Sequence, residues 1–387
     1  MRIILLGLLL LPQETSLRVV ADFPGGSVRV EGIEGRTVRV LPASHPGRGW
    51  DCWWYFRLEG IPAGAPLTLD VGGGVWATPD RAAWSLDGKE WRQTPPGVRE
   101  KTRIRYTLEV PAATAWFAWG PPYVLADARA AVERAAAACP EAKAFELCRS
   151  RDGHSVPAVR VGRIEGERFG IWVQARQHAW ESGGSWVGQG FLDWIVSDDP
   201  RARELRGKAE IAVVPVMDAD NVERGAGGKA QKPQDHNRDW SDEPHWPEVR
   251  AAQAGIKRLD AEGRFDFFVD LHNPGAGDKS PFFFVSPKDM LSEKGQANLR
   301  RFLDAAKEEI VGPLKHKGGV RESGKDYDPK AWERISKNWV TRSAKPHVVA
   351  LTLETSWNTP ESTAENYRRV GRELGLAIEK YLRQSPR

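Results

Sequence analysis

The chain has 387 residues, which is enough for two domains, and 41% of them are hydrophobic, as expected for ordinary globular cores. The formal net charge of +4, from 56 basic and 52 acidic residues without a basic block, argues against a nucleic-acid partner. Three cysteines, Cys52, Cys139 and Cys148, exclude a disulfide-rich scaffold and allow at most one disulfide. We interpret the 17 tryptophans mainly as core residues, although tryptophan also lines peptide- and sugar-binding clefts.

Residues 1–15 resemble a short secretory signal segment. Met1 and Arg2 precede an apolar stretch from Ile3 to Leu11, which is too short to span a bilayer. We therefore expect export to the periplasm or the cell exterior rather than a cytoplasmic location. The structural alternative is a buried N-terminal strand. The sequence offers no other candidate for stable membrane insertion.

Residues 16–123 predict a small antiparallel β-sandwich. Short runs of alternating apolar and polar residues recur, separated by clusters of glycine, proline and aspartate. Clear examples are Thr37–Val40, Trp53–Leu58 and Arg103–Leu108. No cluster of chemically reactive side chains stands out in this part of the chain.

Residues 124–387 predict an α/β domain. An alanine-rich helix over 126–138 precedes continuous apolar strands that alternate with helices, a pattern typical of a mixed, mostly parallel sheet flanked by helices. One helix is expected over 184–196, and the last helix is expected to start at Thr359, with Pro360 in its first turn. The expected strands are 169–174, 211–216, 265–272, 282–286 and 348–354.

The loop after the first of these strands holds His178 and Glu181. A His-x-x-Glu pair is weak support for a metal site when it stands alone. Here an apolar strand ends just before His178, and Gly183-Gly184 precede the next helix. Because open α/β sheets bind ligands in such strand-to-helix loops, the position favours a metal-binding pair.

His272 closes the apolar strand 265–272 and is the third candidate ligand. Two imidazoles and one carboxylate are a known set of catalytic zinc ligands, with one coordination position left for water. Asp270 lies on the same face of the strand, where it could orient His272 through the second ring nitrogen. The alternative is a histidine that is simply hydrogen-bonded in the core. With His178 and Glu181, His272 predicts one zinc ion per chain.

Asn237 and Arg238 form a second candidate site, within the segment 235–240. A planar guanidinium beside an amide suits capture of a substrate carboxylate through two hydrogen bonds. The alternative is a surface ion pair between Arg238 and Asp239.

Glu354 ends the apolar strand 348–354. Carboxylates are seldom buried without a partner, so a glutamate at this point of the chain is conspicuous. A general base that acts on a zinc-bound water needs such a position. The alternative is a glutamate that turns into solvent.

The order of these motifs resembles the zinc metallocarboxypeptidases, and most closely the cytosolic-carboxypeptidase branch and its bacterial relatives. His-x-x-Glu, Asn-Arg, a histidine and Thr-x-Glu follow one another along the chain, and Trp53-Trp54-Tyr55-Phe56 resembles the small sandwich that precedes the catalytic domain in this branch. The resemblance covers nearly the whole chain and implies a carboxypeptidase-like fold.

The resemblance also implies a role for each candidate residue. His178, Glu181 and His272 match the zinc ligands of the family. Asn237 and Arg238 match the pair that binds the terminal carboxylate of the substrate, and Glu354 matches the general base.

Two departures from the family pattern concern the rest of the catalytic site. Where the family has an arginine that stabilises the oxyanion, this chain offers Lys229 or Arg224. A lysine is a point charge rather than a fork, so its contact with the oxyanion would differ. The family's mobile tyrosine has no clear match, since no tyrosine lies between Tyr327 and Glu354.

The resemblance therefore implies a metallocarboxypeptidase that hydrolyses the C-terminal amide bond of peptides, using a zinc-bound water and a glutamate base. Peptide or protein C-termini would be its substrates. One alternative is a zinc N-acyl amino-acid deacylase of the desuccinylase or aspartoacylase type. Another is a non-catalytic protein that binds peptides or glycans. Oligomeric state cannot be read from the sequence.

Overall fold

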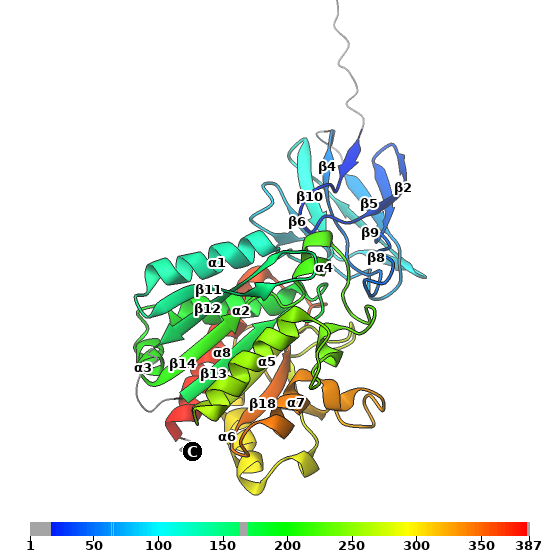
Figure 1. Cartoon of the computed structure of the whole chain (residues 1–387). Helices are drawn as coiled ribbons and strands as arrows, with labels where there is room; N and C mark the ends of the chain where they lie inside the picture. Colours follow the sequence, from blue (N-terminus) through cyan, green and yellow to red (C-terminus); the bar gives the residue numbers. More distant parts are fainter. Residues whose placement is uncertain (1–16, 63, 65, 163–168, 385–387) are drawn as a thin grey trace, which may run out of the picture.

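The computed structural model describes residues 17–62, 64, 66–162 and 169–384 (Figure 1). The segment predicted as a secretory signal, residues 1–15, lies outside the described residues. Among the residues that are described, no helix is long and apolar enough to cross a membrane.

The N-terminal part of the chain forms two five-stranded sheets that enclose one core. All described strand pairs are antiparallel except β3 with β5, so the predicted antiparallel sandwich holds with one parallel pair. Trp54, Phe56 and Phe117 are fully buried between the sheets. In spatial order, the strands are β1 (Arg18–Val20), β4 (Tyr55–Glu59), β10 (Thr114–Ala118), β6 (Ala83–Ser85) and β7 (Arg92–Gln93) in one sheet, and β2 (Arg29–Glu34), β3 (Thr37–Leu41), β5 (Leu67–Val71), β9 (Arg103–Leu108) and β8 (Val98–Glu100) in the other.

An eight-stranded mixed sheet forms the centre of the second part of the chain. Its middle strands β14, β13, β15 and β18 run parallel, whereas β11, β12 and β16 pair antiparallel with their neighbours towards the middle. In spatial order, the strands are β11 (Ala142–Arg149), β12 (Ser155–Gly162), β14 (Ala209–Val214), β13 (Phe169–Ala175), β15 (Phe265–His272), β18 (Val349–Glu354), β16 (Phe282–Val285) and β17 (Gly319–Glu322).

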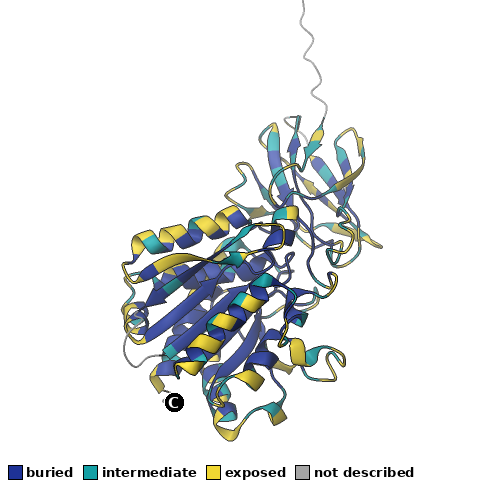
Figure 2. Cartoon of the chain, viewed as in Figure 1, coloured by how far each residue is buried: buried dark blue, intermediate teal, exposed yellow. Residues whose placement is uncertain are grey.

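Helices cover both faces of this sheet. Ile171 and Val173 of β13 enter a core with α2, α3, α6 and α8, while Trp172 enters a second core with α5 and α7. This explains the continuous apolar strands: β14, β15 and β18 are buried at every residue, and the middle of the sheet is mostly dark blue in Figure 2. The helices are α1 (Leu125–Ala138), α2 (Ser182–Ile195), α3 (Pro200–Lys208), α4 (Ala219–Arg224), α5 (Pro247–Ala261), α6 (Glu293–Glu309), α7 (Ser336–Ser343) and α8 (Ala364–Gln384), with short 3-10 turns η1 (His236–Arg238), η2 (Lys288–Met290) and η3 (Trp332–Arg334).

The last helix starts later than the sequence predicts. Thr359 and Pro360 belong to a turn, in which the Thr359 hydroxyl lies 2.9 Å from the Ser362 hydroxyl. The helix begins after Thr363, whose hydroxyl accepts a hydrogen bond from the Asn366 backbone N–H. The predicted cap, Thr359, is therefore four residues too early. Thr363 caps the helix instead, because its hydroxyl accepts a hydrogen bond from the backbone of the first turn.

Candidate metal centre and adjoining cavity

His178, Glu181 and His272 come together at the carboxyl ends of the parallel strands. Each residue offers one nitrogen or oxygen atom as a ligand, and these three atoms lie within 4.8 Å of one another. All three side chains are buried. His178 and Glu181 lie in the loop between β13 and α2, and His272 ends β15, which is hydrogen-bonded to β13. The pairing of the two strands therefore joins residues that are more than 90 positions apart.

Arg176 stabilises the loop that carries His178. Arg176 precedes it with a φ of 63°, a left-handed conformation that is uncommon outside glycine and often found at functional sites. Its fully buried guanidinium donates hydrogen bonds to the carbonyls of Ala179 and Tyr123. Because this side chain links Ala179 of the loop to Tyr123 outside it, it holds the backbone between His178 and Glu181 in one conformation.

Both histidines present the same ring atom to Glu181. Nδ1 of His178 lies 2.8 Å from one carboxylate oxygen of Glu181, and Nδ1 of His272 lies 2.6 Å from the other. The opposite ring atoms face two aspartates, with His272 Nε2 at 2.9 Å from Asp270 and His178 Nε2 at 3.5 Å from Asp235. A carboxylate behind each imidazole is the usual support for a metal-ligating histidine, so the donor set fits a zinc ion.

Asp270 takes the orienting position that its spacing from His272 predicts. Its carboxylate also accepts hydrogen bonds from the Gln177 amide and, at 2.8 Å, from the Ser336 hydroxyl. The sequence pattern does not predict a role for Asp235, because only proximity in space relates it to His178. Its signal in the sequence was its position two residues before Asn237.

The charges at this centre favour a cation. Burial opposes ionisation of Glu181 and Asp235, but the neighbouring histidines outweigh it and lower the pKa of both carboxyls well below the ordinary values. Three carboxylates, counting Asp270, thus surround two imidazoles in a dry environment. Such a cluster is stabilised by a bound dication, which also keeps the ring nitrogens deprotonated.

Glu354 ends β18 directly beside His272, its register partner on β15. Its side chain is only 9% exposed, and its Oε2 atom finds no hydrogen-bond partner among the described residues. Burial raises the pKa of Glu354 to about 7. A carboxyl with this pKa, unpaired and next to a metal-binding group, suits proton transfer near neutral pH.

A cavity of about 220 Å³ borders the metal centre at Glu181. Glu181 and Glu354 line it together with Lys229, Arg321 and Tyr327. The remaining walls are largely aromatic or backbone, and Trp76 comes from the N-terminal sandwich. They are Trp76, Trp180, Asn273, Pro274, Gly275, Asp278, Phe282 and Phe284.

Of the two candidate cations for the oxyanion, Lys229 and Arg224, only Lys229 lines the cavity. Lys229 lines the cavity with Glu354, and among the described residues it makes no ion pair. Arg224 ends α4, remains 47% exposed and pairs with Asp152 at 3.0 Å, outside the lining of the cavity. Its candidacy as a catalytic cation is therefore corrected, since an exposed guanidinium held by another carboxylate does not reach the site.

Asn237 and Arg238 occupy the one-turn helix η1 next to the metal centre. The Asn237 amide nitrogen lies 3.4 Å from His272 Nε2, and its oxygen accepts a hydrogen bond from the Ser336 N–H. Arg238 forms an ion pair at 2.6 Å with Asp328, not with Asp239. Asp239 is buried and accepts hydrogen bonds from the backbone of residues 245 and 246, so the predicted alternative of an Arg238–Asp239 pair is wrong.

Tyr327 is a cavity residue that the sequence analysis passed over. It is 48% exposed, and its ring centroid lies 5.9 Å from the Arg238 guanidinium carbon. No tyrosine lies between residues 327 and 354, and Tyr327 itself lines the cavity. No local pattern distinguishes it, because the loop that carries it folds back over η1.

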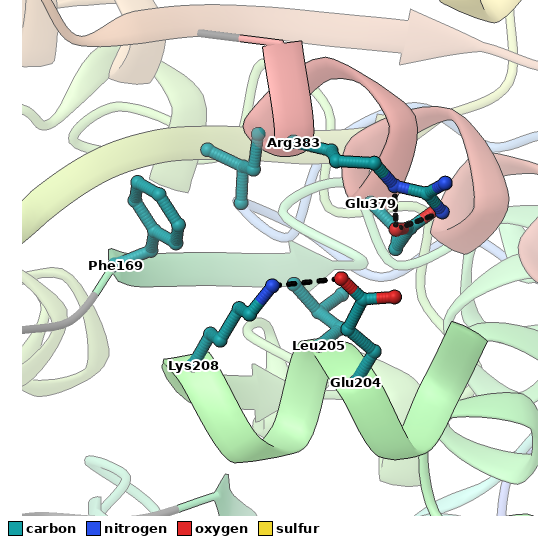
Figure 3. A pocket seen from close by; sticks show the side chains of 7 residues that line it. Phe169, Glu204, Leu205, Lys208, Glu379 and Arg383 are labelled. Carbon is teal, nitrogen blue, oxygen red and sulfur yellow. Dashed lines mark hydrogen bonds and ion pairs between the residues drawn. The ribbon is translucent and has the colours of Figure 1, made fainter. Parts of the chain in front are cut away.

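A second cavity lies at the opposite ends of the strands, near the start of β13 (Figure 3). It measures about 410 Å³, and its charged groups are paired: Lys208 with Glu204, and Arg383 with Glu379. Among the described residues that line it there is no histidine or cysteine. Its chemistry therefore suggests no reaction, although it is larger than the cavity at the metal centre.

The mixed sheet, the two-histidine, one-glutamate group and the unpaired glutamate beside it define a metal-dependent hydrolase. Comparison with known proteins specifies the family further. A model of the zinc carboxypeptidase family matches residues 129–276. This match, together with sequence relatives among the cytosolic carboxypeptidases and the shared fold of bacterial metallocarboxypeptidases, supports a metallocarboxypeptidase of this family.

Relatives by sequence cover different shares of their own length. An uncharacterised protein of Zymomonas mobilis is 28% identical over 273 residues, which are 67% of this chain and 68% of that protein. Cytosolic carboxypeptidase 2 of Danio rerio is 26% identical over 260 residues, which are 57% of this chain and 35% of that protein. The chain thus spans only about a third of the length of this cytosolic carboxypeptidase.

Solved structures share the fold over nearly the whole chain. A metallo-carboxypeptidase from Burkholderia cenocepacia superposes with a TM-score of 0.81 at 19% identity, covering 95% of this chain and all of that chain. A metallo-carboxypeptidase from Pseudomonas aeruginosa gives a TM-score of 0.80 at 22% identity, over 95% and 99% of the two chains. The carboxypeptidase-like α/β fold with an N-terminal sandwich, expected from the sequence, is confirmed.

Proposed function

We propose that the protein removes C-terminal residues from peptides, with His178, Glu181 and His272 as the ligands of one zinc ion. The observation that carries this proposal is the arrangement of two Nδ1 atoms around one carboxylate, each ring backed by an aspartate. When bound, zinc supplies a polarised water and a Lewis acid for the scissile carbonyl.

Glu354 would act as the general base. Its unpaired oxygen and raised pKa allow it to accept a proton from the attacking water and to pass it to the leaving amine. Lys229 would stabilise the negative charge that develops on the carbonyl oxygen. A donor in such a position typically contributes about 3–4 kcal/mol to transition-state stabilisation.

Asn237 and Arg238 would bind the terminal carboxylate of the substrate and so confine cleavage to the last peptide bond. Arg238 is held by Asp328 through Nε and by the Asn237 carbonyl through Nη1. A substrate carboxylate would therefore approach the remaining nitrogen, Nη2, from the side of Tyr327. Tyr327, which is 48% exposed and lines the cavity, would close over the bound residue.

Because the cavity is small, the experiment must also test the alternative deacylase activity. A volume of about 220 Å³ accommodates a single residue, and an N-acyl amino acid would also present a terminal carboxylate and an amide. A panel of N-blocked dipeptides, longer peptides and N-acetyl and N-succinyl amino acids separates the two activities. We expect turnover of peptides, with loss of the last residue.

The decisive experiment compares wild-type protein with Glu354→Gln, with bound zinc measured in both. Glu354→Gln should retain one zinc per chain and lose turnover by about 10²- to 10⁴-fold, the usual contribution of a positioned base. Glu204→Gln, in the cavity of Figure 3, is the matched control and should behave as wild type. Unchanged turnover in Glu354→Gln would remove this residue from the mechanism.

We also propose that the protein is exported. The support is the apolar stretch from Ile3 to Leu11. Intact-mass analysis of the protein recovered from the periplasm or medium of the native host should show a shortened N-terminus. Recovery of the uncleaved chain from the cytoplasm alone would contradict this proposal.

A further inference from the structure

A loop of the N-terminal sandwich, residues 47–50, lies along the loop that carries Lys229. Three backbone hydrogen bonds join them: Gly228 N–H to the Arg48 carbonyl at 2.9 Å, Trp50 N–H to the Lys229 carbonyl at 3.0 Å, and Lys232 N–H to the Gly47 carbonyl at 2.8 Å. The sandwich is thus fastened to the wall of the active-site cavity rather than only to its own neighbouring strands.

Glycines allow the two backbones to approach this closely. Gly49 has a φ of 96°, and a Cβ atom on it would lie 2.6 Å from the Lys229 carbonyl oxygen. A Cβ atom on Gly227 would lie 2.1 Å from the Trp50 carbonyl oxygen. Since any side chain at either position would separate the loops, their contact is a specific feature of both segments.

The contact places an aromatic ring under the Lys229 ammonium. Nζ of Lys229 lies 5.4 Å from the centroid of the Trp50 ring, within the range of a cation–π interaction. The Trp50 ring in turn lies 4.9 Å from the ring of Trp76, which lines the cavity. The ring of Trp180, between the candidate ligands His178 and Glu181, lies 5.9 Å from Trp76.

A lysine in this position needs such support. Its ammonium is carried on a flexible four-carbon chain and has no planar fork to fix its direction. Among the described residues, no carboxylate forms an ion pair with Lys229; Asp235 and Glu354 act on its charge only from a distance, whereas the Trp50 ring lies against the ammonium. An aromatic face attracts the cation without neutralising it, which leaves its charge available to the substrate.

We propose that Trp50 is a positioning residue that holds Lys229 in its catalytic orientation, so that the sandwich domain supplies part of the active site. This inference rests on the proposed hydrolysis with Lys229 at the oxyanion. Its effect should appear in kcat rather than KM, because the charge on the carbonyl oxygen develops only in the transition state.

The first test is a double-mutant cycle in the full-length zinc protein. Trp50→Leu should lower kcat by about 3- to 30-fold, the range of a cation–π interaction, with KM and zinc content little changed. In a Lys229→Ala background the same substitution should have almost no further effect, because its target is gone. Trp50→Phe should recover most of the activity. Trp91→Leu, elsewhere in the sandwich, is the control and should leave kcat unchanged.

A second test preserves the shape of the side chain, so it remains informative if Trp50→Leu does not fold. Tryptophans carrying one, two and three fluorines at position 50 weaken the negative potential of the ring stepwise without removing it. The logarithm of kcat should fall steadily with fluorine number, whereas the same series at Trp91 should be flat.

A flat series at position 50 would overturn the proposal, as would equal losses from Trp50→Leu with and without Lys229. Failure of this inference is distinguishable from failure of the proposed function. If wild type hydrolyses peptides and Glu354→Gln does not, the hydrolase assignment stands whatever the Trp50 series shows. If wild type neither binds zinc nor cleaves peptides, the function itself is wrong.

Discussion

The two ends of the central sheet carry cavities of opposite character. At the carboxyl end of β13 the cavity is smaller, about 220 Å³, and is lined by Glu354, whose buried Oε2 atom has no hydrogen-bond partner among the described residues. At the other end the cavity is larger, about 410 Å³, and its charged groups are satisfied by one another (Figure 3). Unpaired buried polar atoms, rather than cavity size, identify the functional end.

Removal of metal should give the largest difference between the two ends. Chelation should abolish hydrolysis, and readdition of zinc should restore it, because the polarised water depends on the ion. At free zinc 100-fold above its Kd, the ion should stabilise the fold by about 2.7 kcal/mol. Thermal unfolding with and without zinc checks this. Glu181→Gln should lose the zinc-dependent shift, whereas a shift that persists in this variant would place the metal elsewhere.

We expect the folded protein to lose stability as the pH rises, because His236, near the metal centre, loses its proton. The buried ring of His236 lies 3.6 Å from Asp218 and 3.5 Å from Glu248. Burial opposes the charge, but the two carboxylates outweigh this effect and raise the pKa of His236 to about 9 from its ordinary value of 6.5. The contribution of the charged His236 ring to the free energy of unfolding is complete below pH 6.5 and is lost as the pH rises towards 9.

The expected change is up to about 3 kcal/mol, from the pKa difference between the folded and unfolded chains. Urea unfolding of the zinc-saturated protein between pH 6 and 9.5 measures it. His236→Asn should flatten this dependence. A wild-type protein whose unfolding free energy rises over the same interval would contradict the predicted charge on this ring.

The carboxylate behind His272 should matter more than another aspartate on the same strand. Asp270→Asn removes the charge that orients the ring, and loss of such a partner usually lowers metal affinity about 10- to 100-fold. Competition with a chromophoric chelator measures the affinity. Asp266→Asn, at the opposite end of β15, is the matched control and should keep the wild-type value; equal losses in both variants would indicate a general effect on the strand.

The paired groups of the second cavity should give the smallest effects. Lys208→Ala breaks an exposed ion pair with Glu204, one turn away on α3. Because exposed pairs contribute little, neither turnover nor the unfolding midpoint should change measurably. A fall in turnover would show that this end of the sheet takes part in the reaction after all.

Much of the site could be predicted from local pattern. The apolar runs that end at Ala175, His272 and Glu354 mark strands buried on both faces, and parallel strands bring their carboxyl ends to one edge. The two-residue period of a strand also predicted that Asp270 shares a face with His272. Both inferences need only the geometry of a strand.

Other features depended on segments that meet only in the folded chain. Asp235 supports His178 across 57 positions of sequence, and Tyr327 reaches the cavity because its loop folds over η1. The choice between Lys229 and Arg224 could not be made from spacing, since both cations lie within the same short segment. It was decided by which side chain faces Glu354 and which one pairs with Asp152.

The sequence by itself determined the identity and order of the chemical groups, because strand periodicity and the loop positions of histidine and glutamate are local properties of the chain. Tertiary structure alone decided how Trp50 and Trp76 of the sandwich contribute to a site built on another sheet. That contact depends on how the sandwich packs against the α/β part of the chain, with Trp180 and Trp357 entering the sandwich core, and no residue pattern within either part encodes this arrangement.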